Sequence, residues 1–168
     1  MNPLIIAILR AFQLVFSVVV LGISISLAKG QHINSVPGAT GYAAFTGGLG
    51  TLASLIGAAA IFIESFQTFL SWAIDGLASL AFVTGGIIYA VYLRNTNCSN
   101  QLTSCTNSII NGGSFRDGKK TICWYSGGKL NSRCTSAKAD MVFMFLGFAV
   151  CAAVCGMVFL RRRKGGYV

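Results

Sequence analysis

Residues 4–28 read LIIAILRAFQLVFSVVVLGISISLA, an apolar run interrupted by one charged side chain, Arg10. Three further apolar runs follow, at Thr40–Ile63, Phe66–Leu93 and Ala139–Leu160. A helix rises about 1.5 Å per residue and the hydrocarbon core of a bilayer is about 30 Å thick, so about 20 residues suffice to cross it. Each run is at least that long. The sequence therefore predicts an all-α membrane protein, an antiparallel bundle of four transmembrane helices.

The composition agrees with a membrane protein that has a single domain, residues 1–168. Of the 168 residues, 54% are hydrophobic and 10% are charged, whereas soluble domains carry about 25% charged residues. The four runs use most of the chain, so we expect no separate catalytic domain. The net charge of +9 lies mainly beside the apolar runs, where membrane lipid rather than nucleic acid is the expected partner.

Two features predict that both termini lie in the cytoplasm. The fourth run is followed directly by a basic stretch, Arg161, Arg162, Arg163 and Lys164, within the short tail 161–168. Positive charge beside a span favours the cytoplasmic side, and here it is also the expected contact with lipid headgroups. The segment 94–138 holds an even set of cysteines, which indicates disulfides in an extracellular loop: Cys98, Cys105, Cys123 and Cys134.

That extracellular loop is polar, and we expect its disulfides to order it. Of the three possible pairings we favour Cys98–Cys105 with Cys123–Cys134, because each bond then closes a local loop. Asn97 begins the sequence Asn-Cys-Ser and is a candidate glycosylation site.

The same loop contains a strand-like stretch, Thr121–Tyr125, followed by Ser126, Gly127 and Gly128 and then by Lys129-Leu130. This order predicts a β-hairpin with a glycine turn. Trp124 and Tyr125 form either the small core of the loop or an anchor at the headgroup interface.

Small residues recur at helical spacing within the apolar runs, which indicates faces for close helix packing or for an oligomer contact. We assign to these faces Gly47, Gly50, Ser54 and Gly57 in the second run, Gly76 and Gly86 in the third, and Gly156 in the fourth.

Arg10 lies about two turns into the first run, and Asp75 lies about equally deep in the third run from the same side. A charge in hydrocarbon is costly unless it is paired or faces water. We therefore predict an Arg10–Asp75 ion pair, which either fixes helix register or lines a hydrated pathway. Glu64 either joins Arg10 or is solvated. Near the other membrane surface, we expect Asp140 to form an interfacial pair with Lys29.

The sequence lacks the usual motifs of catalysis and metal binding. His32 is the only histidine, and G-x-S-x-G, H-E-x-x-H and phosphate-binding glycine loops are missing. The loop cysteines do not have the C-x-x-C spacing of zinc sites. We therefore expect no enzyme, no metal and no cofactor, with a sterol, a sphingolipid or an anionic phospholipid as bound lipid. Cys155 is either a packing residue or a site of palmitoylation.

The chain resembles the fungal tetraspan proteins of the MARVEL-like, non-classical export family. The resemblance rests on Ile8-Leu9-Arg10 with Phe12, Phe62-Ile63-Glu64, Trp72 with Asp75, a cysteine-containing outer loop and a basic stretch after the fourth run. It implies a plasma-membrane protein that organises eisosome-associated microdomains and responds to sphingolipids. The chain departs from this pattern in its four-cysteine loop and in its short tail, which moves the expected partner contacts to the loop.

Three functions remain open on this basis. The first is a non-enzymatic plasma-membrane organiser that forms homo-oligomers, sorts lipids and contacts other microdomain proteins. The second is a small channel or transporter that uses Arg10 and Asp75, and the third is an accessory subunit of a larger membrane complex. Channels and transporters usually show repeats, broken helices or several charges at mid-membrane, and we find none of these, which favours the first.

Overall fold

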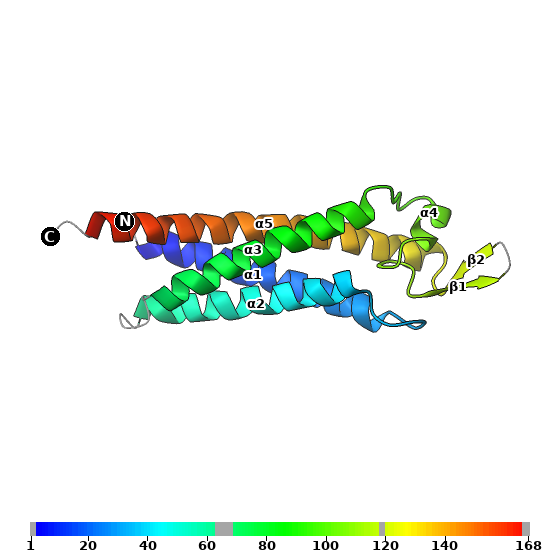
Figure 1. Ribbon diagram of the computed structural model, residues 1–168, viewed down its shortest axis with the longest axis horizontal. Coiled ribbons are helices and arrows are strands. Elements are labelled where there is room, and N and C mark those ends of the chain that lie inside the picture. Colours follow the sequence, from blue (N-terminus) through cyan, green and yellow to red (C-terminus); the bar gives the residue numbers. More distant parts are fainter. Residues whose placement is uncertain (1–2, 63–68, 118–119, 166–168) are drawn as a thin grey trace.

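The protein is an antiparallel bundle of four long helices with a small cap at one end (Figure 1). The computed structural model describes residues 3–62, 69–117 and 120–165. The four long helices are α1 (Pro3–Lys29), α2 (Gly38–Phe62), α3 (Phe69–Leu93) and α5 (Gly127–Gly165). They form a ring in which α1 packs on α2, α2 on α3, α3 on α5 and α5 on α1. The start of α1 and the end of α5 lie together, opposite the cap.

Each long helix contains a segment apolar enough to cross a membrane, which confirms the predicted fold class. These segments are Leu4–Lys29, Gly38–Ala60, Trp72–Leu93 and Gly127–Met157. The protein is therefore a multi-pass membrane protein.

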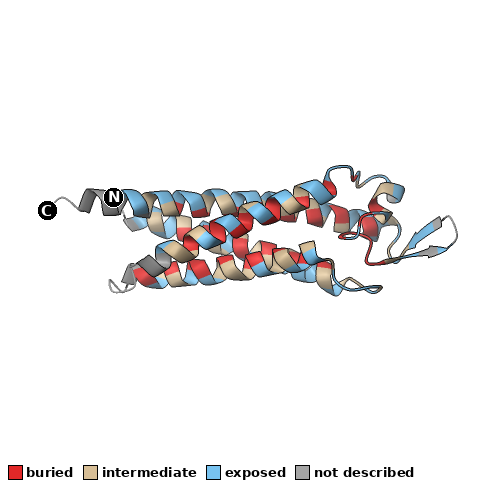
Figure 2. Ribbon diagram, viewed as in Figure 1, coloured by how far each residue is buried: buried red, intermediate tan, exposed pale blue. Residues whose placement is uncertain are grey.

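Buried residues form stripes on the inner faces of the helices (Figure 2). These stripes contain polar as well as apolar side chains, while many large apolar side chains are exposed. Helix α1 is the clearest case. Its buried residues recur at alternating spacings of three and four: Arg10, Gln13, Ser17, Val20, Ser24 and Leu27. Its exposed residues include Ile8, Phe12, Val15 and Val18. Lipid solvates apolar side chains but offers no hydrogen bonds, so polar groups must find partners inside the bundle.

Glycines on α2 allow the helices to approach closely. A Cβ atom on Gly47 would lie 2.6 Å from the backbone nitrogen of Leu21, and one on Gly50 would lie 2.6 Å from the ring of Phe82. Side chains at these positions would push α1 and α3 away from α2. Gly86 on α3 likewise packs against Phe145 of α5, 3.1 Å from the position of its missing Cβ. The predicted packing role therefore applies to these three glycines.

Helix α5 begins at Gly127 and ends at Gly165, whereas the sequence predicted a helix over 139–160. The predicted start was wrong because it was read from the apolar run alone, whereas the polar residues 127–138 continue the same helix towards the cap. Leu130, Cys134 and Ala137 are buried and share one face at helical spacing. At the other end the basic stretch 161–164 belongs to the last turns of α5 and not to a separate tail.

The cap consists of helix α4 (Gln101–Cys105), strands β1 (Ser114–Asp117) and β2 (Lys120–Cys123), and the polar first part of α5. The strands form an antiparallel hairpin in which Ser114 pairs with Cys123. A hairpin was predicted, but with the wrong partner: its second strand is the strand-like stretch at 121–123, and its first strand precedes it. Gly127, expected in the turn, instead begins α5 with a φ of 59°.

The disulfides join Cys98 to Cys134 and Cys105 to Cys123, so the predicted pairing was wrong. The local rule failed because the hairpin folds back onto α4 and because α5 begins early enough to carry Cys134 to the end of α3. One bond therefore links the loop after α3 to α5, and the other links α4 to β2.

We expect Gly47→Ala to lower the free energy of unfolding by about 1–3 kcal/mol, because the added methyl group meets the backbone of Leu21. The neighbouring Gly48 is the matched control, since a Cβ atom there has no neighbour within 4 Å. Denaturant or thermal unfolding in a mild detergent measures both variants. Equal loss of stability in both would contradict the close approach of α1 and α2.

We also expect peptide mapping without reduction to recover the two disulfides separately. Trypsin and chymotrypsin together cut at Leu102, between Cys98 and Cys105. The peptide with Cys98 should remain linked to the one with Cys134, and the peptide with Cys105 to the one with Cys123. A peptide pair that links Cys123 to Cys134 would instead support the local pairing.

Candidate functional site

The most polar site of the bundle interior is the ion pair between Arg10 of α1 and Asp75 of α3. Arg10 Nη2 donates to Asp75 Oδ2 at 2.5 Å, and Arg10 Nη1 donates to Asp75 Oδ1 at 2.6 Å. The side chains are 5% and 2% exposed. The predicted ion pair is therefore present, and its two parallel hydrogen bonds have the bidentate geometry that makes arginine–carboxylate pairs strong.

Two more helices complete this site. Gln13 accepts from Arg10 Nη1 at 2.8 Å through Oε1, and its Nε2 donates to Asp75 Oδ1 at 3.1 Å and contacts Cys151 Sγ of α5 at 3.3 Å. On α2, Gly57 leaves the space that the guanidinium fills, because a Cβ atom there would overlap it. The spacing of three from Arg10 places Gln13 on the same face of the first helix, but its hydrogen bonds to the ion pair were not predicted.

An apolar side chain closes this polar site on the side towards the cap. Asp75 and Phe82 are seven residues apart on α3 and both are buried, so they lie on the same face about 10 Å apart along the axis. Missing Cβ atoms of Gly50 on α2 and Gly147 on α5 would lie 2.6 and 3.0 Å from the Phe82 ring. The ring therefore contacts two diagonally opposed helices and fills the bundle interior between them.

Asp140 does not form the predicted interfacial pair with Lys29. It is fully buried while Lys29 is exposed, and its Oδ2 accepts a hydrogen bond from Ser24 Oγ at 2.8 Å. The prediction was wrong because it placed Asp140 at the start of the fourth helix. Since α5 begins at Gly127, Asp140 lies well inside it, on the face that packs against α1.

Arg133 of α5 holds the cap on the bundle. Its Nε donates to the carbonyl of Ile110 at 2.8 Å, and its Nη2 donates to the carbonyl of Leu27 at the end of α1 at 3.0 Å. Its guanidinium carbon also lies 4.9 Å from the centre of the Tyr125 ring, where a cation–π attraction is expected. Tyr125 is therefore part of the core of the cap.

Trp124 has a different environment from its neighbour. It is 55% exposed and stacks on His32, with ring centroids 5.0 Å apart. Tyr125 also contacts His32, because its hydroxyl oxygen lies 3.0 Å from His32 Nε2. His32 thus joins the α1–α2 connection to the cap.

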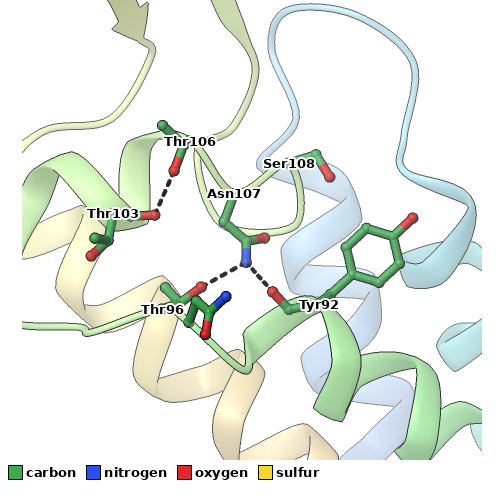
Figure 3. A pocket seen from close by; sticks show the side chains of 7 residues that line it. Tyr92, Thr96, Thr103, Thr106, Asn107 and Ser108 are labelled. Atoms are coloured by element: carbon green, nitrogen blue, oxygen red, sulfur yellow. Dashed lines mark hydrogen bonds between the residues drawn. The ribbon is translucent and has the colours of Figure 1, made fainter.

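A shallow pocket of about 380 Å³ lies where the cap meets the end of α3 (Figure 3). Asn107 is one of its lining residues and donates to the Tyr92 carbonyl at 2.7 Å and to Thr96 Oγ1 at 2.9 Å. The remaining lining residues are Asn95, Thr103, Thr106 and Ser108. All of these lining residues are uncharged.

Several predicted residues have a less defined place. Asn97 is exposed, with its Oδ1 accepting from the Ser99 nitrogen at 3.1 Å. Glu64 lies outside the described residues, as do the side chains of residues 161–164. Within the described part of the chain, no three histidine, cysteine, aspartate or glutamate side chains gather as a metal site would require.

Comparison with protein families gives a match over nearly the whole chain. The family described as "MARVEL: Membrane-associating domain" matches residues 3–157. No curated protein and no solved structure matches the chain.

We expect Asp75→Asn to lower the free energy of unfolding by about 3–5 kcal/mol, because it leaves Arg10 charged and unpaired inside the bundle. Arg10→Met and the double variant complete a double-mutant cycle. The double variant should be more stable than the sum of the single effects predicts, because it buries no unpaired charge. Additive effects would contradict a direct ion pair.

Proposed function

The chain belongs to the MARVEL family of membrane-associating domains, and on that premise we propose that it is a non-enzymatic membrane organiser that associates laterally with its own copies. We further propose that it acts in the plasma membrane, with both termini in the cytoplasm and the disulfide-bonded cap outside. The two disulfides of the cap support this orientation, because such bonds persist in oxidising compartments.

The observation that carries this proposal is an exposed face of small residues on α5. Ala149, Ala152, Ala153 and Gly156 are all exposed, and their spacings of three, one and three place them on one side of the helix. A Cβ atom on Gly156 would have no neighbour within 4 Å. In lipid, helices associate mainly through close packing of such small residues, so this face suits a helix of a second copy.

The other glycines of the long helices fall into two groups: some pack against a neighbouring helix, and others have no neighbour within 4 Å of a Cβ position. Gly47, Gly50 and Gly57 pack inside the bundle, so they are not available for contacts between copies. Gly76 on α3 is open like Gly156. It lies one turn from Trp72, whose carbonyl is 3.9 Å from Cys155 Sγ, so both open glycines lie near the contact between α3 and α5.

The outer surface also supports a role in sorting lipids. Large apolar side chains cover it, among them Phe45, Leu80 and Val91, and they would be in contact with acyl chains or with a sterol. The basic residues 161–164 end α5 on the side that we assign to the cytoplasm, where anionic headgroups are enriched. Sphingolipid-rich microdomains with other membrane proteins are the setting that we propose for this assembly.

A channel through Arg10 and Asp75 is less well supported. Both Nη atoms of Arg10 donate hydrogen bonds to Asp75 or Gln13. The Phe82 ring fills the bundle interior about two helical turns closer to the cap. A conducting path would have to displace that ring and break a bidentate pair. We therefore assign the ion pair a structural role.

The test is to place a large side chain on the α5 face. We expect Gly156→Leu to weaken self-association in bilayers about tenfold, equivalent to about 1.4 kcal/mol, as measured by energy transfer between labelled copies at increasing protein density. Gly48→Leu is the matched control, because a Cβ atom on Gly48 also has no neighbour within 4 Å, while Gly48 lies on α2. Self-association that is unchanged in Gly156→Leu, or absent in the unmodified protein, would contradict the proposal.

A further inference from the structure

A second buried polar cluster lies in the half of the bundle nearer the cap, and each of the four long helices contributes one residue to it. Ser24 comes from α1, Thr40 from α2, Tyr89 from α3 and Asp140 from α5. All four side chains are at most 1% exposed. The function proposed above does not use them.

The oxygen atoms of this cluster are incompletely satisfied. Ser24 Oγ donates to Asp140 Oδ2 at 2.8 Å. The Tyr89 hydroxyl lies near Ser24, Thr40 and Asp140. Tyr89 Oη, Thr40 Oγ1 and Asp140 Oδ1 form no hydrogen bond of standard geometry within the described part of the chain. A buried polar atom that lacks a partner is costly.

Asp140 also lacks a positively charged partner within the described part of the chain, in contrast to Asp75. Among the described residues the one ion pair within 4.0 Å is Arg10–Asp75, at the other half of the bundle. The nearby Arg133 is engaged with the carbonyls of Leu27 and Ile110. A carboxylate buried in a membrane bundle usually has a positively charged partner.

We propose that Ser24, Thr40, Tyr89 and Asp140 form a binding site for a sodium ion. A carboxylate and hydroxyl oxygens are the donors that hard cations prefer. One carboxylate balances one positive charge, which favours a monovalent ion over Ca²⁺ or Mg²⁺. The ion supplies the partner that three oxygens lack, and it links all four helices near the cap as Arg10 does at the other half.

The test measures the thermal unfolding midpoint of the full-length protein in detergent while choline chloride is replaced by sodium chloride at constant ionic strength. A ligand that binds the folded state raises the midpoint with its concentration. We expect the midpoint to rise by about 3 °C or more when the sodium concentration is about ten times the Kd. Asp140→Asn should abolish the rise, whereas Asp117→Asn, an exposed residue of β1, should retain it.

Thr40→Val and Tyr89→Phe keep the proposal testable if Asp140→Asn does not fold. Each removes one hydroxyl, and each should shift the response to about tenfold higher sodium concentration. The proposal would be overturned by an unfolding midpoint that is the same in sodium and in choline. It would also be overturned if these variants responded to sodium at the same concentration as the unmodified protein. A midpoint that depends on pH but not on sodium would also overturn it and would assign a proton to Asp140.

Discussion

A guanidinium group inside a bundle of apolar helices must find its counter-charge within the protein, because the surrounding lipid provides none. Arg10 meets this requirement through Asp75, and the rest of the bundle is arranged around the pair. α1 and α3 are diagonal to each other in the ring, so the pair can form only if both α2 and α5 leave room for it. Gly57 on α2 leaves that space. On the side of α5 the small Cys151 contacts Gln13, which accepts a hydrogen bond from Arg10 and donates one to Asp75.

The same constraint separates the inside of the bundle from its outside. Most of the buried charged and hydrogen-bonding side chains of the long helices lie in the interior, where Gly47 brings α2 close to the backbone of α1. Many large apolar side chains lie on the outside, where lipid solvates them. The positions that we propose for contacts between copies, Ala149, Ala152, Ala153 and Gly156, accordingly lie on the outward side of α5, whereas Gly47, Gly50 and Gly57 pack within the bundle.

The parts of this structure that follow from one-dimensional rules could be predicted. Hydropathy found the four spans, and equal depth from one side of the membrane identified Arg10 and Asp75 as partners. The fold of the cap could not be predicted in this way, because it depends on contacts between segments that are distant in the sequence. Its disulfide pairing is set by the hairpin, which brings Cys123 to Cys105, and by the early start of α5, which brings Cys134 to Cys98. The spacing of Leu130, Cys134 and Ala137 was the available signal for that start, and its neglect also placed Asp140 wrongly at the start of the fourth helix.

The distance in sequence between Arg10 and its partner has a consequence for biosynthesis. The two residues are 65 positions apart, and a ribosome adds about 5–20 residues per second. Arg10 is therefore made about 3–13 s before the carboxylate that neutralises it. During that interval the first span needs another environment that solvates its charge, at the membrane surface or inside the insertion machinery. The final position of the first helix in the lipid is thus decided only when the third helix arrives.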